Sequence, residues 1–186
     1  MQIFTKKSVI KIPKEIHLLY DQKKNRLVLI GPQGTEFLVL PCKLSLKIKK
    51  HCVFIHQTTI KKICHKNTCG TTRAIIKQRL LELTVKLRST LKLIGVGFKT
   101  YLHSIKNGHI LQFKLGFSHF IFLRIPQDTQ IITFKNIKLF VSNPSLQKLT
   151  HLCAIIRSLK YPEIYKGKGI LYAQEKIILK KGKKIT

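Results

Sequence analysis

Acidic residues are scarce in this chain. Of its 186 residues, 36 are Lys or Arg and only 7 are Asp or Glu, which gives a formal net charge of +29. Self-repulsion of this size destabilises a compact chain in isolation, but it becomes favourable beside a dense polyanion that releases condensed counterions on binding. Because the charge is spread along the whole chain rather than along one amphipathic face, a nucleic acid is favoured over an anionic membrane.

Long apolar runs are also missing. Hydrophobic residues make up 44% of the chain, but lysine and other polar residues break them into short runs, as in HILQFKLGFSHFIFLRI. None of these runs approaches the ~18 apolar residues of a membrane span. The opening residues, MQIFTKKSVIKIPKEIHLLY, lack the apolar core of a secretory signal and alternate as a strand does. We therefore expect no membrane span and no removable leader.

No group of residues has the pattern of a catalytic site. The carboxylates form no close pair for acid–base chemistry, and the histidines lack an H-E-x-x-H or H-x-E arrangement. A P-loop needs G-x4-G-K-[ST] between a strand and a helix. KGKG (166–169) follows an expected helix and has no Ser or Thr for magnesium, and GVGF (95–98) is expected inside a strand. We expect no enzymatic activity and no cofactor.

Metal-ligand spacing is poor as well. The segment CHKNTC (64–69) has one loose spacing, with His51 and Cys52 upstream, whereas structural zinc sites use paired knuckles. The five cysteines, an odd number without an export signal, favour free thiols in a reducing compartment. We therefore expect a basic loop with free thiols here and no metal site.

The hydrophobic pattern that is present predicts two similar halves. Turn signals and β-branched runs predict strands in the first half at NRLVLIG, TEFLVLP, LSLKIKK and CVFIHQ. The second half repeats this plan at LKLIGVGFKTYLHSI, HILQFKLGF, HFIFLRIP, TQIITF and KLFVSN. FLVLP, ending at Pro41, matches FLRIP, ending at Pro126, and AIIK from Ala74 matches AIIR from Ala154.

Each half also contains one helical period. The first helix is expected from Thr72, with Thr71 or Thr72 as its cap and one apolar face made by Ile76, Leu80, Leu83 and Leu87. The second is expected after NPS, with a face made by Leu149, Cys153, Ile156 and Leu159. We predict an α+β fold with two tandem copies of a small antiparallel sheet and one helix, residues 1–87 and 88–186, and a basic C-terminal extension.

The segment YPEIYKGKGILY (161–172) suits a polyanion. Its glycines allow close approach of the backbone to a phosphate, two lysines add charge, and three tyrosines can stack or hydrogen-bond. Further basic residues lie upstream and at the end of the chain: Arg157, Lys160, Lys180, Lys181, Lys183 and Lys184. A solvated surface turn is the alternative interpretation.

Four segments in register resemble the L-six family of large-subunit ribosomal proteins. They are GTTRAIIKQRL, LKLIGVGFKTYL, LQFKLGFSH and CAIIRSLKYPEIYKGKGILYAQEKI, and the start KKSVIKIPKEI resembles the family's first strand. That family has two copies of one α+β domain. The resemblance implies a structural constituent of the ribosome that binds large-subunit rRNA near the sarcin–ricin loop and the stalk base, beside neighbouring ribosomal proteins.

The resemblance also implies which residues contact rRNA. The contacts are expected in the C-terminal segment 161–186 and just upstream of it, at Arg157, Lys160, Tyr165, Lys166, Gly167, Lys168, Gly169, Lys180, Lys181, Lys183 and Lys184. GFSH (116–119) also matches the family pattern, and a structural role is expected for it first.

The chain departs from the family pattern at several positions. Glu82 and Lys86 stand where the family usually has glycines, so a longer first helix is expected. Phe120 stands where proline is common, and Thr150 where glycine is often found. HQTTIKKICHKNTC matches poorly, so its partner is not predicted.

Composition bears on the compartment. The abundance of Lys, Ile, Leu, Phe and Asn is typical of AT-rich genomes, and the chain starts directly at the family's first strand. We expect an organelle-encoded protein of the mitochondrial matrix, with a plastid or a bacterial cytoplasm as alternatives. A free-standing organellar RNA- or DNA-binding protein is the rival function.

Overall fold

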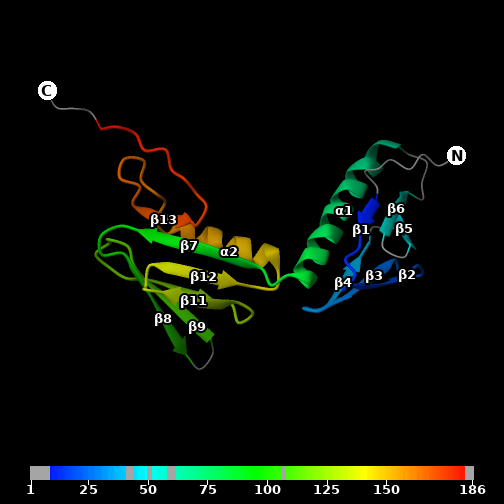
Figure 1. Cartoon of the computed structure of the whole chain (residues 1–186), viewed down its shortest axis with the longest axis horizontal. Coiled ribbons are helices and arrows are strands. Elements are labelled where there is room, and N and C mark those ends of the chain that lie inside the picture. Colours follow the sequence, from blue (N-terminus) through cyan, green and yellow to red (C-terminus); the bar gives the residue numbers. More distant parts are fainter. Residues whose placement is uncertain (1–8, 41–43, 50–51, 58–61, 106–107, 183–186) are drawn as a thin grey trace. The chain divides into compact units, whose positions relative to one another are not determined.

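The computed structural model describes residues 9–40, 44–49, 52–57, 62–105 and 108–182, and it divides the chain into two compact units, Met1–Lys86 and Leu87–Thr186 (Figure 1). The first unit contains two small antiparallel sheets and one helix. One sheet has the order β2-β3-β4, with β2 His17–Asp21, β3 Arg26–Gly31 and β4 Gly34–Val39. The other has the order β1-β6-β5, with β1 Val9–Lys11, β5 Leu44–Lys49 and β6 Cys52–Gln57. The helix is α1, Lys62–Thr84.

The second unit repeats this plan and adds one strand. Its first sheet has the order β10-β9-β8, with β8 Lys99–Ile105, β9 Gly108–Lys114 and β10 Ile121–Ile125. Its second sheet has the order β11-β12-β7-β13, with β7 Arg88–Ile94, β11 Gln130–Phe134, β12 Lys138–Ser142 and β13 Gly169–Tyr172. The helix α2, Leu146–Ser158, packs against β7, β12 and β13 (Figure 1).

The strand orders match between the units. The order β1-β6-β5 corresponds to β7-β12-β11, and β2-β3-β4 corresponds to β8-β9-β10. The predicted α+β class with two tandem copies is therefore confirmed, and each copy holds two small sheets. The added strand β13 pairs with the free edge of β7, so the segment after α2 belongs to the fold of the second unit.

Alternation of apolar residues explains the two cores. In β3, Leu27 and Leu29 are fully buried against α1, which contributes Ile76, Leu80 and Leu83. In the second unit the predicted face of α2 is buried at Leu149, Cys153 and Ile156, with Leu152 beside them. Burial of one face of each element against a shared core is the expected stabilising arrangement for such short strands.

The predicted start and end of the first helix were wrong. α1 begins at Lys62, so Thr72 lies inside it, and the Thr72 hydroxyl donates to the carbonyl oxygen of Thr68 at 2.7 Å instead of capping the helix. A threonine can bond its own helix backbone in this way, which makes it an ambiguous start signal. Leu87 lies beyond the helix and packs against the core of the second unit.

Two other local predictions were also wrong. GVGF does not lie inside a strand: it forms the turn between β7 and β8, in which the Phe98 N–H donates to the Gly95 carbonyl at 3.3 Å. The run LKLIGVGFKTYLHSI is therefore two strands that belong to two different sheets. CHKNTC is part of α1 and not a loop, because the helix starts before it.

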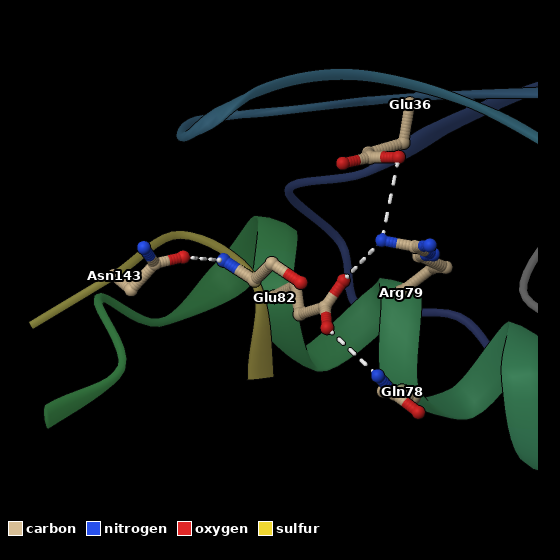
Figure 2. Close-up of polar contacts among 6 residues, drawn as sticks. Glu36, Gln78, Arg79, Glu82 and Asn143 are labelled. Atoms are coloured by element: carbon tan, nitrogen blue, oxygen red, sulfur yellow. Dashed lines mark hydrogen bonds and ion pairs between the residues drawn. The ribbon is translucent and has the colours of Figure 1, made fainter. Parts of the chain in front are cut away.

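Glu82, one of the departures from the family pattern, is buried near the end of α1. Its carboxylate accepts hydrogen bonds from Gln78 Nε2 at 2.9 Å and from Arg79 Nη1 at 2.8 Å, and only 3% of its side chain is exposed (Figure 2). The Arg79 guanidinium also lies 3.6 Å from the carboxylate of Glu36 in β4. These contacts fasten the end of the helix to the neighbouring sheet, as a buried carboxylate requires paired donors.

Candidate nucleic-acid interface

Residues 160–169, here called the basic loop, connect α2 to β13. The Ile170 N–H donates to the Lys160 carbonyl at 3.0 Å and closes the loop at its base. Two further hydrogen bonds brace its tip: Gly167 N–H to the Glu163 carbonyl, and Glu163 N–H to the Lys168 carbonyl, each 2.9 Å. These backbone hydrogen bonds satisfy polar groups of the loop internally and stabilise its fold.

The two glycines of the basic loop are buried within it. A Cβ at Gly169 would lie 2.6 Å from the Cα of Pro162, and Gly167 has a φ of +66°, which disfavours residues with a Cβ. The Gly167 amide is already used by Glu163. The structure thus gives both glycines a role in folding the loop, and the exposed residues at its tip are Glu163, Ile164, Tyr165 and Lys166.

Arg157 is half-buried and is held by neighbouring side chains of the second unit. Its guanidinium pairs with the Glu175 carboxylate and lies over the ring of Tyr172, 5.5 Å from the centroid, and over that of Tyr161, at 5.8 Å. The same carboxylate accepts from the Tyr172 N–H at 3.2 Å. Arg157 therefore fastens the turn after β13 to the end of α2. Burial, and next the neighbouring Cys153, raise the pKa of the Tyr172 phenol above its ordinary value.

Lys160 contacts the GFSH segment. Its Nζ lies 4.4 Å from the centroid of the Phe117 ring, a cation–π geometry, and the Phe117 ring stacks on His119 with centroids 5.9 Å apart. A Cβ at Gly116 would lie 3.2 Å from the ring of Phe98, so the GVGF turn meets the same region. Three segments that are distant in the sequence support one another at the base of the basic loop.

The C-terminal segment returns to the basic loop (Figure 1). The Lys180 N–H donates to the Ile164 carbonyl at 3.2 Å, and the Leu179 side chain lies against Gly167. Lys180 and Lys181 are exposed there, beside the basic loop. We call Tyr165, Lys166, Lys168, Lys180 and Lys181 the basic surface.

The structure thus divides the predicted contact residues into three sets. Four members of the basic surface are exposed and Lys168 is half-buried, Arg157 and Lys160 are engaged by neighbouring side chains, and both glycines are internal. Lys183 and Lys184 lie outside the described residues. The sequence analysis did not single out Glu175, one of the two carboxylates in the basic segment 161–186, although a carboxylate among many cations is a candidate for an ion pair.

The described part of the chain contains neither a cluster of metal ligands nor a helix that could span a membrane. Within the described ranges, no group of three or more His, Cys, Asp or Glu side chains could hold a metal ion. Cys52, Cys69 and Cys153 are free thiols, and burial raises the pKa of the Cys153 thiol. Among the same residues, neither helix combines the length and the apolar character needed to cross a membrane.

Comparison with known proteins identifies the family. No protein-family model matches the chain. It is 36% identical over 176 residues to the large ribosomal subunit protein uL6 of Mycoplasmoides gallisepticum, covering 94% of this chain and 93% of that protein. It is 33% identical over 174 residues to uL6 of Alkaliphilus oremlandii, covering 94% of each chain. It is 30% identical over 178 residues to uL6 of Sinorhizobium medicae, covering 96% of this chain and 97% of that one. The resemblance is confirmed, and the chain belongs to the uL6 family of large ribosomal subunit proteins.

Proposed function

We propose that the chain is a structural, non-catalytic constituent of the large ribosomal subunit and that it binds large-subunit rRNA through the basic surface. The hydrogen bond between Lys180 and Ile164 is the observation that supports this most directly, because it brings the C-terminal lysines to the basic loop. The loop and the C-terminal segment then offer one group of cations to the RNA backbone. Each phosphate that a lysine neutralises releases counterions, which is the main source of affinity for such a surface.

The residues of the site have different tasks in this proposal. Lys166, Lys180 and Lys181 are exposed and contact phosphates, whereas Tyr165, with 57% of its surface exposed, offers a ring on which a base can stack. Lys168 is half-buried and contributes charge beside them. Arg157 acts as a positioning residue through Glu175. The glycines act by allowing the tight fold that projects the lysines.

The finer setting of the protein is also proposed. The rRNA site is near the sarcin–ricin loop and the stalk base, as the family resemblance implies, and neighbouring large-subunit proteins are further partners. For the compartment, the Lys-, Ile- and Phe-rich composition supports a mitochondrial matrix or a plastid, whereas the bacterial relatives are compatible with a bacterial cytoplasm. Cell fractionation of the source organism, followed by detection of the protein in each fraction, distinguishes these compartments.

The experiment compares two pairs of lysine substitutions in the full chain. Lys166→Gln with Lys168→Gln removes charge from the basic surface, and Lys23→Gln with Lys24→Gln removes the same charge from an exposed turn of the first unit. Binding to a large-subunit rRNA transcript is measured across a salt series. The first pair should reduce the salt slope by about 0.7–0.9 for each phosphate that is no longer neutralised, and the control pair should leave it unchanged.

Equal slopes for both lysine pairs would show that the basic surface faces solvent, and the proposal for this site would be wrong.

The rival function is tested by sedimentation. A ribosomal constituent co-sediments with the large subunit and is released when magnesium chelation dissociates the particle. A free-standing RNA- or DNA-binding protein would be absent from the large-subunit fraction at moderate salt.

A further inference from the structure

The sheet β8-β9-β10 of the second unit has one buried and one exposed face. In β9, Leu111 and Phe113 are fully buried, so the alternating Gln112 and Lys114 lie on the opposite face. In β8, Thr100 is fully buried, whereas Lys99 and Tyr101 on either side of it are exposed. The buried side of this sheet belongs to the core of the second unit, and the other side carries aromatic and basic side chains.

The strand register aligns two aromatic rings on the exposed face. Tyr101 and Phe122 both pair with Gln112, one from each side, so the three residues form a row across the sheet. Tyr101 is 36% exposed and Phe122 is 62% exposed. Two strand spacings separate their Cα atoms, roughly 10 Å. Aromatic rings arranged across a sheet in this way can stack successive unpaired bases.

Cations flank this aromatic row on both sides. Lys99 pairs with Lys114 on one side of the row, and exposed Arg124 lies on the other. No ion pair found in the described part of the chain involves any of these three. The three acidic residues of the second unit, Asp128, Glu163 and Glu175, lie outside these strands. We call Lys99, Tyr101, Gln112, Lys114, Phe122 and Arg124 the aromatic–basic face.

The side-chain amide of Gln112 can donate a hydrogen bond to a ligand on this face. Nε2 of His103 lies 2.7 Å from its Oε1, and because this oxygen only accepts, the imidazole donates and the amide nitrogen of Gln112 is left to donate elsewhere. A side-chain amide between two rings can reach the polar edge of a base that stacks on either ring.

The first unit provides an internal comparison, because β2-β3-β4 has the same order and register. Its equivalent row is Leu19, Val28 and Phe37, and Val39 takes the place of Arg124. Leu19, Phe37 and Val39 are each more than half exposed. The first unit thus keeps an aromatic ring at the position of Phe122 but has apolar residues at the positions of Tyr101, Gln112 and Arg124, so folding does not require these three residues of the second unit. Their presence points to a partner of that unit.

We infer that the aromatic–basic face binds unpaired nucleotides of rRNA, as a second RNA contact separate from the basic surface. Tyr101 and Phe122 stack on bases, Gln112 hydrogen-bonds a base edge, and the flanking lysines and arginine bind phosphates. The inference rests on the proposed function, since it assumes that rRNA is the partner. RNA is favoured over a protein because the centre of the row is polar and every formally charged group around it is cationic.

The test uses the full chain and a labelled single-stranded RNA of about twelve nucleotides, which is within the site sizes of about 4–16 nucleotides of known single-strand-binding domains. Tyr101→Leu with Phe122→Leu removes both rings and keeps the charge, and leucine is the residue that the first unit has at the position of Tyr101. Phe37→Leu is the matched control in the first unit. The double variant should bind about fivefold to 150-fold more weakly for each base that no longer stacks, with an unchanged salt slope.

A second pair separates stacking from charge. Lys114→Gln with Arg124→Gln should lower the salt slope by about 0.7 for each phosphate that is no longer neutralised, while circular dichroism and the melting temperature stay as in the parent. The Phe37→Leu control should bind as the parent does. Photo-crosslinking with 4-thiouridine in the same RNA should modify peptides that contain Tyr101 or Phe122.

Each contrary result has one meaning. If the face variants bind RNA as the parent does while Lys166→Gln with Lys168→Gln binds weakly, the inference is wrong and the proposed function stands. If neither the face variants nor Lys166→Gln with Lys168→Gln changes RNA binding, both the inference and the proposed rRNA-binding site are wrong. If the face variants bind RNA normally but lose a neighbouring ribosomal protein during subunit assembly, the face is a protein contact and the inference is overturned.

Discussion

Substitution of Gly169 by alanine tests whether this glycine is needed for the fold of the basic loop or for contact with RNA. The added Cβ would lie 2.6 Å from Pro162 Cα, 2.7 Å from Pro162 N and 2.8 Å from the Tyr161 carbonyl carbon. All three are backbone atoms, so no side-chain rotation relieves the clash. The φ of +154° is a second obstacle for any residue with a Cβ.

The two costs can be separated. A non-glycine residue in such a conformation costs roughly 1–3 kcal/mol, and overpacking against a rigid neighbour costs about 1–3 kcal/mol more. Gly169→Ala should therefore lower the free energy of unfolding of the second unit by about 2–6 kcal/mol. Gly108→Ala is the matched control in the same unit, because its φ is +140° and the nearest atom to its Cβ would be 4.0 Å away. It should show only the first cost.

Urea denaturation followed by circular dichroism measures the stability of both variants. Hydrogen exchange of the Ile170 amide, which donates to Lys160 across the base of the loop, reports on the loop itself. Exchange of this amide should be faster in Gly169→Ala than in Gly108→Ala. If Gly169→Ala matched Gly108→Ala in stability and exchange but bound rRNA more weakly, the glycine would serve close approach of RNA, and the packing argument would be refuted.

Two further predictions concern other buried groups of the second unit. Glu175→Gln should lower its free energy of unfolding by about 1–3 kcal/mol, because the half-buried Arg157 loses its charged partner, whereas Asp128→Asn at an exposed pair should change it by less than about 1 kcal/mol. Equal effects in thermal melting would contradict this. Burial raises the pKa of Cys153, so unfolding at high pH releases a proton from its thiol and stability should fall as the pH rises above about 8.5. At pH 8, Cys153 should react with a thiol reagent more slowly than half-buried Cys69, and equal rates would be the contrary result.

Local patterns predicted much of the fold correctly. The predicted hairpin of NRLVLIG and TEFLVLP is formed by β3 and β4, and the predicted face of α2 is buried. Apolar residues recur every second residue in a strand and every three or four residues in a helix, so a short stretch of sequence is enough to recognise either element. The segment GVGF was predicted wrongly, because its apolar neighbours continue the strand pattern on both sides. Only the tertiary structure reveals a turn there: Gly95 packs on Phe98, and the strands before and after the turn pair in different sheets.

The candidate site was predicted only in part, because some of its features depend on residue type and others on tertiary contacts. The lysines of the basic loop stood out by residue type, and the loop lies between a helix and a strand as expected. The engagement of Arg157 by Glu175 and two tyrosines could not be predicted, because it depends on the path of the chain after β13. The aromatic–basic face was missed because its residues come from three strands and only their register brings them together.

The sequence by itself determined the charge, the duplicated α+β pattern and the resemblance to one ribosomal family, because composition, period and motif order are properties of the chain alone. Only the tertiary structure decided which cations are exposed and which are paired. It also showed that the glycines of YPEIYKGKGILY are buried inside the loop, where Gly169 packs on Pro162. The physical reason is that burial and pairing depend on contacts between distant segments, and those contacts exist only once the sheets and helices have packed together.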